Sequence, residues 1–197
     1  RRFCLRITGC LSGSPIYAVF PGPAFSRTCI LQGTRHPNGN AMAPDLPYYC
    51  VDGRQNVSVY VSLDATPAET AVRFLAGSHR SSQLYFPRHF VDGSDYVQDD
   101  KTMASVTQLE ASFREEDIRR FALEPGDALL FDFRTLHGTT DAPIKARRRA
   151  FSTRWLGDDM VYCERAGETS PPLEDLGVTP GAPMPESMFP TLWQGTA

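Results

Sequence analysis

A histidine and an arginine eleven residues apart carry the strongest chemical signal in this sequence. His137 follows an apolar run at 128–133, and Arg148 precedes a second one at 150–156. Histidine is the commonest protein ligand for a metal ion, and the arginine fork binds a carboxylate through two parallel hydrogen bonds. If the two runs form neighbouring strands, they could present a metal and a carboxylate-bearing co-substrate to one cavity.

Each candidate residue also has a plainer interpretation. An aspartate such as Asp45, which precedes Leu-Pro, more often ends a turn or caps a helix. A histidine in the position of His137 more often makes ordinary hydrogen bonds at a strand end. Arg148 belongs to the basic triplet at 147–149, and such triplets usually form a solvated edge. If the strand continues through Ser152, however, Arg148 and Ser152 share a face with small neighbours that leave room for an anion.

The elements that must position these residues are predicted to be mostly strands. The segment 56–63 alternates apolar and polar residues strictly, as a half-buried strand does. Pro and Gly punctuate short apolar runs, which favours a β-sandwich or jelly roll with irregular loops. Residues 81–118 are polar and irregular and are expected to form a lid or loop over one mouth. The remaining predicted strands are 71–75, 121–123, 128–133 and 150–156.

Composition bounds the protein class. A chain of 197 residues suits one compact domain, and no apolar run reaches the ~18 residues of a transmembrane helix. A net charge of −3 argues against a nucleic-acid binder. The five cysteines are scattered and form no CxxC pair, which favours a reduced, cytoplasmic protein over a disulfide framework.

Taken in order, the motifs resemble those of the phytanoyl-CoA dioxygenase family of Fe(II)/2-oxoglutarate oxygenases. The family pattern runs His-x-Asp-Leu-Pro-Tyr, Asp-Gly, Leu-Asp, Arg-Phe-x-x-Gly-Ser-His, Pro-Gly-Asp, Leu-His-Gly and Arg-x-Ala-x-Ser. The resemblance covers about residues 45 to 160 and implies a double-stranded β-helix, a cupin-like jelly roll. We expect an oxygenase core at 45–166, a Pro/Gly-rich tail at 167–197 and a doubtful segment at 1–44. The chain reads Asp45-Leu46-Pro47-Tyr48, Asp52-Gly53, Leu63-Asp64, Arg73-Phe74-Leu75-Ala76-Gly77-Ser78-His79, Pro125-Gly126-Asp127, Leu136-His137-Gly138 and Arg148-Arg149-Ala150-Phe151-Ser152.

The resemblance also implies the roles of individual residues. Asp45 and His137 would be ligands of Fe(II), and Arg148 would pair with the far carboxylate of 2-oxoglutarate. Thr139, two residues after His137, would help to hold that co-substrate. The implied reaction uses O₂ to hydroxylate or otherwise oxidise a small organic substrate, with no nucleic acid or membrane as partner.

One iron ligand of the family is absent. A facial triad needs two histidines and one carboxylate, and the first histidine of His-x-Asp falls on Ala43, which has no donor atom. Whether the chain is an active enzyme therefore stays open. The alternative is a catalytically dead jelly-roll module that binds ligands in the same cavity.

The N-terminal composition suggests a reason for this defect. Residues 1–44 contain five arginines and no acidic residue. Met42 is encoded ATG and every alanine codon begins with G, so reading one base later gives tryptophan. If Ala43 is encoded GCA, the next shifted codon is CAC, histidine. We therefore interpret residues 1–43 as a possible frame error, with a genuine basic arm as the competing explanation.

Overall fold

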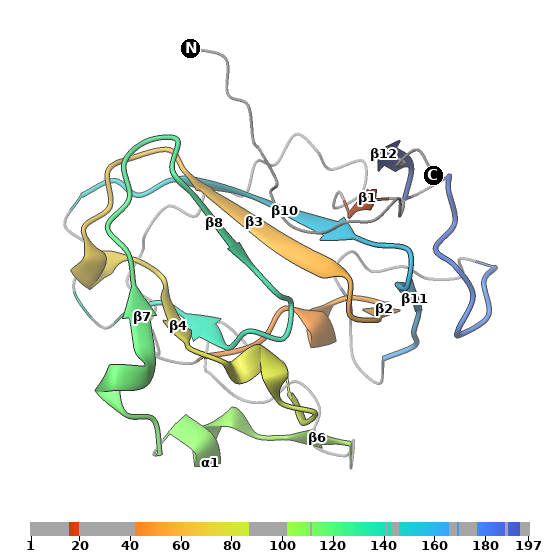
Figure 1. The fold of residues 1–197 in the computed structure, drawn as a ribbon, viewed down its shortest axis with the longest axis horizontal. Coiled ribbons are helices and arrows are strands. Elements are labelled where there is room, and N and C mark those ends of the chain that lie inside the picture. The colour runs from red at the N-terminus through yellow and green to blue at the C-terminus, as the bar shows by residue number, and fades with distance from the viewer. Residues whose placement is uncertain are drawn as a thin grey trace.

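The computed structural model describes residues 16–19, 42–86, 102–110, 112–140, 142, 146–165, 169, 177–187 and 189–193, and the following description refers to them. Two layers of strands dominate the molecule (Figure 1). A five-stranded sheet has the order β12-β1-β10-β3-β8, and a three-stranded sheet has the order β7-β4-β9. The two remaining pairs are β11-β2 and β5-β6. The expectation of a mainly β fold is confirmed.

Short elements supply all of this regular structure. The strands are β1 (Ile16–Val19), β2 (Val51–Asp52), β3 (Asn56–Ser62), β4 (Arg73–Leu75), β5 (Leu84–Tyr85), β6 (Met103–Ala104), β7 (Ile118–Arg120), β8 (Ala128–Phe131), β9 (His137–Gly138), β10 (Ala150–Leu156), β11 (Val161–Tyr162) and β12 (Thr191–Trp193). The helices are α1 (Val106–Glu110) and the 3-10 turns η1 (Leu46–Tyr48), η2 (Ala68–Thr70), η3 (Ser78–Arg80) and η4 (Glu115–Asp117).

The centre of the large sheet turns a polar face inward. In β3 the buried residues include Ser58, Tyr60 and Ser62, whereas Leu63, just beyond the strand, is exposed. Side chains two apart on a strand share a face, so the three polar residues form one inward row. Buried serines and tyrosines need hydrogen-bond partners. A strand whose polar face points inward is therefore suited to line a ligand-binding site rather than a hydrophobic core.

The small sheet brings β9 next to β4. Phe74 pairs with His137, and Ala43 forms an isolated antiparallel bridge to His137 from the other side. The prediction of a strand at 121–123 was wrong. The strand that pairs with β4 is β7, which ends at Arg120, and within 121–123 Leu123 makes only an isolated antiparallel bridge to Thr66.

Aromatic and aliphatic side chains hold the two layers together. Phe74 of the small sheet packs against Phe131 of the large one, with 5.0 Å between ring centroids. The largest buried cluster gathers Leu46, Val51 and Phe133, and the C-terminal Phe189 joins it. Phe113 and Ile118, from the segment expected to form a lid or loop, pack against a second cluster around Leu136. No helix in the described part of the chain is both long and apolar enough to cross a membrane.

Candidate active site

Asp45 lies at the start of η1, yet its side chain does not cap that helix. Pro47 and Leu46 are buried and anchor the turn, and the Asp45 carboxylate makes no capping hydrogen bond. It instead accepts a hydrogen bond from Ser58 Oγ at 2.5 Å and is only 7% exposed. The side chain therefore points at the inward row of β3, and the interpretation of Asp45 as a cap residue does not hold.

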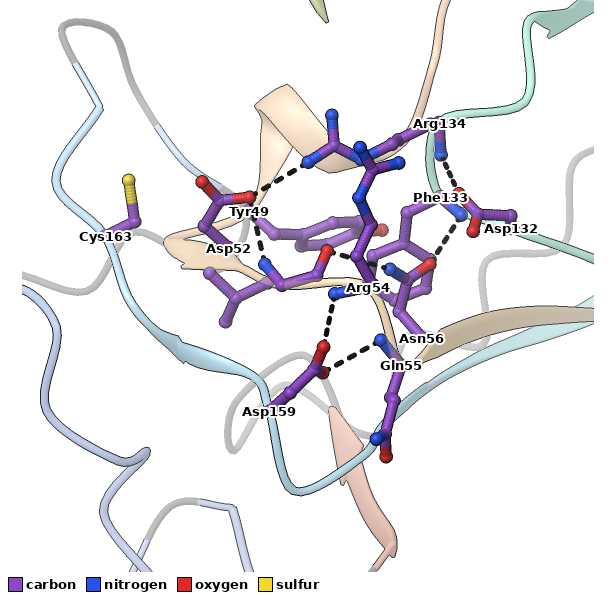
Figure 2. Close-up of polar contacts among 12 residues, drawn as sticks. Tyr49, Asp52, Arg54, Gln55, Asn56, Asp132, Phe133, Arg134, Asp159 and Cys163 are labelled. Atoms are coloured by element: carbon purple, nitrogen blue, oxygen red, sulfur yellow. Dashed lines mark hydrogen bonds and ion pairs between the residues drawn. The ribbon is translucent and has the colours of Figure 1, made fainter. Parts of the chain in front are cut away.

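The peptide of Phe133 fixes the backbone around Asp45. The amides of Asp45 and Leu46 both donate to the Phe133 carbonyl, at 2.7 and 3.0 Å. The Phe133 amide in turn donates to Asn56 Oδ1 at 2.7 Å, which Figure 2 shows within a wider polar network. The start of β3 and the loop after β8 thus locate the carboxylate together.

That network continues to the turns on either side (Figure 2). Asp159 accepts hydrogen bonds from the amides of Arg54 and Gln55, both at 2.8 Å. Arg134 contacts Asp52 at 3.2 Å. These bonds join the β2–β3 turn to the β10–β11 turn and to the loop before β9.

His137 faces Asp45 with one nitrogen and the backbone with the other. Its Nδ1 lies 2.9 Å from the Thr135 carbonyl, so Nδ1 carries the proton and donates it. In the neutral ring this tautomer leaves a lone pair on Nε2, which lies 3.7 Å from Asp45 Oδ1. A ring held by one nitrogen while the other is left for a metal is the usual arrangement of a metal-binding histidine. Stacking on Phe74 at 5.9 Å and contact with Phe131 at 4.7 Å restrain the imidazole further.

Position 43 is the cross-strand neighbour of His137. The two residues exchange both backbone hydrogen bonds, Ala43 N to His137 O at 2.9 Å and the reverse at 3.2 Å. Directly opposed residues of an antiparallel pair project to the same face, with Cβ atoms about 4.5–5.5 Å apart. A donor at position 43 would therefore stand beside His137 and, two residues away, Asp45. The methyl group of Ala43 supplies none.

Arg148 is buried just before β10 and has an unused donor. It is 6% exposed, one terminal nitrogen donates to the Thr70 carbonyl, and its Nε is buried without a hydrogen-bond partner. No carboxylate of the described residues pairs with it. Burial raises the pKa of Tyr60 while Arg148 opposes that rise, which places the two side chains near each other. A buried guanidinium with an unsatisfied N–H is suited to an anionic ligand.

The other arginines of the triplet behave differently. Arg147 is largely exposed and reaches Asp64 at 3.3 Å, and Arg149 forms a closer pair with the same carboxylate at 2.9 Å. The interpretation of the triplet as a solvated edge thus fits Arg147 but not Arg148. Thr139 follows β9, and its carbonyl accepts a hydrogen bond from Arg73 Nε at 3.0 Å.

Arg154 is the residue of this site that the sequence interpretation missed. Its Nε lies 2.9 Å from Asp45 Oδ2, and one terminal nitrogen donates to Oδ1 at 3.3 Å. The guanidinium carbon lies 5.7 Å from the centre of the Tyr49 ring. Burial alone would lower the pKa of Arg154, but Asp45 and Tyr49 outweigh it and raise that pKa. The available signal was period two along β10, because positions 148, 150, 152 and 154 share one face.

The comparison with known families decides the identity of the fold. Residues 2–150 match the family described as phytanoyl-CoA dioxygenase (PhyH). The chain belongs to the phytanoyl-CoA dioxygenase family. Among curated proteins, no sequence matches this chain significantly.

Solved structures agree on the fold of this phytanoyl-CoA dioxygenase family member. The non-heme alpha ketoglutarate dependent epimerase SnoN from nogalamycin biosynthesis is 16% identical, with a TM-score of 0.55 over 92% of this chain and 66% of SnoN. SnoN has also been solved with Fe3+, alpha ketoglutarate and nogalamycin RO. The carbocyclase SnoK from the same biosynthesis is 17% identical, with a TM-score of 0.51 over 76% of this chain and 54% of SnoK. The chain thus spans less than two thirds of the length of each of these relatives. The predicted cupin-like jelly roll is confirmed by the shared fold.

The residues present fit 2-oxoglutarate better than they fit iron. The Nε–H of Arg148 is buried without a hydrogen-bond partner, and a carboxylate oxygen of 2-oxoglutarate could accept its hydrogen bond. For the metal, two ligands in neighbouring positions at about 2.0–2.2 Å from one ion would lie about 3 Å apart, and Asp45 Oδ1 and His137 Nε2 are 3.7 Å apart. However, no group of three or more His, Cys, Asp or Glu side chains within the described ranges could hold a metal ion. The iron site is therefore incomplete.

Proposed function

We propose that this chain carries the active site of an Fe(II)- and 2-oxoglutarate-dependent oxygenase that oxidises a small organic substrate with O₂. Arg148 binds the far carboxylate of 2-oxoglutarate, and Thr139, which follows the strand that carries His137, helps to hold the same co-substrate. Asp45 and His137 face the metal. Because Ala43 supplies no third ligand, the chain as written holds Fe(II) weakly and turns over negligibly.

The observation that carries this proposal is the convergence of distant segments. Asp45 and His137, 92 positions apart in the sequence, present Oδ1 and Nε2 to each other at 3.7 Å. Ser58 on β3 and Arg154 on β10 occupy one cross-strand pair beside them. Arg148 precedes the same strand, so a dicarboxylate could extend along the inward face of β10 from Arg148 towards Asp45.

The side chains between the two ends suit such a ligand. Ala150 and Ser152 share the inward face of β10, where they contribute little bulk. Tyr60 is the cross-strand partner of Ser152, and burial raises the pKa of its hydroxyl against the opposing charge of Arg148. The protein's own contribution is thus to bind and orient the co-substrate between a cationic end and a metal-facing end.

The test is a calorimetric titration of 2-oxoglutarate into the chain and two matched variants. Charge-assisted hydrogen bonds are worth about 1.5–3 kcal/mol, so Arg148→Met should weaken binding by roughly ten- to a hundred-fold. Arg147→Met removes a neighbouring exposed arginine and should change the affinity little. Equal losses in the two variants, or none in either, would count against the assignment of Arg148.

A second candidate function is a binding module without turnover. Ala43 favours it, because the module would need the co-substrate end of the site but no complete metal site. The two candidates differ in their use of iron. An oxygenase forms succinate from 2-oxoglutarate when Fe(II) is supplied and the ligand set is complete, whereas a binding module retains 2-oxoglutarate unchanged in every variant.

A further inference from the structure

The Asp45 carboxylate is already neutralised by a cation of the chain itself. Arg154 approaches both of its oxygens, Oδ2 through Nε at 2.9 Å and Oδ1 through a terminal nitrogen at 3.3 Å. Ser58 also donates a hydrogen bond to Oδ2. Only 10% of the Asp45 side chain is exposed, and its carboxylate needs such partners because an uncompensated buried charge is strongly destabilising. Here the partners of the carboxylate are groups of the chain itself.

The oxygen that faces His137 is part of this pair. Oδ1 lies 3.7 Å from Nε2 of His137, and it also accepts the hydrogen bond that a terminal nitrogen of Arg154 donates. A metal bound between Asp45 and His137 would therefore have to take Oδ1 from the guanidinium. It would also bring a second positive charge close to Arg154, in a partly desolvated site where screening by water is weak.

Arg154 is itself held in place from other sides. It donates to Ser152 Oγ on its own strand and lies over the ring of Tyr49. Only 17% of its side chain is exposed. A side chain restrained by an anion, a hydroxyl and an aromatic face does not leave the site without losing all three contacts.

We propose that Arg154 acts as the resident cation of this site, so that the chain as written keeps Asp45 ordered without a metal and disfavours a divalent ion there. The absence of a donor at position 43 and the presence of Arg154 then have the same consequence. The site keeps its side-chain arrangement when no metal ion is bound. This inference rests on the proposed assignment of Asp45 and His137 as the metal-facing pair, but it does not depend on 2-oxoglutarate or on Arg148.

The test uses Co(II) as the probe and two readouts, the melting temperature and the Co(II) dissociation constant from a titration followed by absorbance. Arg154→Met leaves Asp45 without its cation, so its melting temperature should fall, and saturating Co(II) should restore part of the loss. Its Co(II) affinity should exceed that of the parent by roughly ten- to a hundred-fold, the equivalent of one charge-assisted hydrogen bond released. The parent and Arg147→Met should show no stabilisation by the same Co(II) concentration.

Arg154→Lys is the conservative variant and covers the case in which Arg154→Met does not fold. It keeps the positive charge, so it should stay insensitive to Co(II) like the parent. Equal Co(II) affinity in the parent and Arg154→Met would overturn the proposal, as would tight Co(II) binding by Arg154→Lys or by the parent. A failed Arg148 titration with these Co(II) results intact would reject the co-substrate assignment alone.

Discussion

Replacing Ala43 by histidine should convert the incomplete metal site into a facial triad. The backbone already places this position correctly, because Ala43 and His137 exchange hydrogen bonds at 2.9 and 3.2 Å. A pair that exchanges both bonds has its Cα atoms about 5.5 Å apart and its side chains on one face. Ala43 is only half-buried, so the added imidazole would not be enclosed by the core on every side.

The size of the gain can be bounded from the ligands. Loss of a residue that merely supports a metal ligand costs about 10–100-fold in affinity or activity. Addition of a direct ligand should gain at least as much, which corresponds to about 1.4–2.7 kcal/mol. We therefore expect Ala43→His to bind Fe(II) at least ten-fold more tightly than the parent in an anaerobic titration. It should also form succinate in a reaction that requires 2-oxoglutarate.

Ala43→Leu is the matched control, since it adds bulk at the same position without a donor atom. It should bind Fe(II) no better than the parent. Two results would refute the reasoning: tight stoichiometric Fe(II) binding by the unmodified chain, or the same affinity for the histidine and leucine variants. Either would mean that another residue completes the site and that the assigned ligand set is wrong.

Two further predictions concern the frame around the site. Asn56→Ala removes the acceptor of the Phe133 amide, and an unsatisfied buried donor costs about 1–3 kcal/mol, so chemical denaturation should show a loss of this size. An unchanged unfolding free energy would contradict the role given to Asn56. The hydrogen bonds and ion pairs from Arg149, with Arg147 adding to them, lower the pKa of Asp64 to about 2. Because the folded pKa is depressed, the stability that this carboxylate contributes is present above pH ~4 and is lost as the pH falls towards 2. Asp64→Asn should therefore flatten the fall in melting temperature over that range, and an identical acid profile in both proteins would count against it.

The sequence predicted three strands of the large sheet, β3, β8 and β10, but not its edge partners β1 and β12, and it predicted the small sheet less well. Strict alternation located β3, and β10 has the predicted bounds, 150–156, because both strands pair along their full length with each other. The run at 121–123 is as apolar as many strands. The edge of β4 is nevertheless taken by the segment just before it, Ile118 to Arg120. Local pattern cannot distinguish two adjacent candidates for one ladder position.

The site shows a similar division. Motif order identified Asp45, His137 and Arg148, and the structure brings the first two within 3.7 Å. Arg154 escaped notice because it follows the recognised motif, and its importance arises from a partner 109 positions away. The polar inward row of β3 was visible as an alternation, but the sequence alone did not say which face was buried.

The frame-error hypothesis for residues 1–43 stays a prediction. Apart from 16–19, residues 1–41 lie outside the described ranges, and so do the five arginines on which the hypothesis depends. Within the described part, β1 pairs with both β10 and β12. The encoding nucleotide sequence across Met42 and Ala43 would test the hypothesis directly.

A crystal structure of Ala43→His with Co(II) and 2-oxoglutarate would test the central claim most directly. The account predicts one metal about 2.0–2.2 Å from Asp45 Oδ1, His137 Nε2 and the introduced imidazole. It also predicts Arg154 in contact with Oδ2 only and the far carboxylate of 2-oxoglutarate hydrogen-bonded to Arg148. A metal bound elsewhere, or 2-oxoglutarate without contact to Arg148, would contradict it.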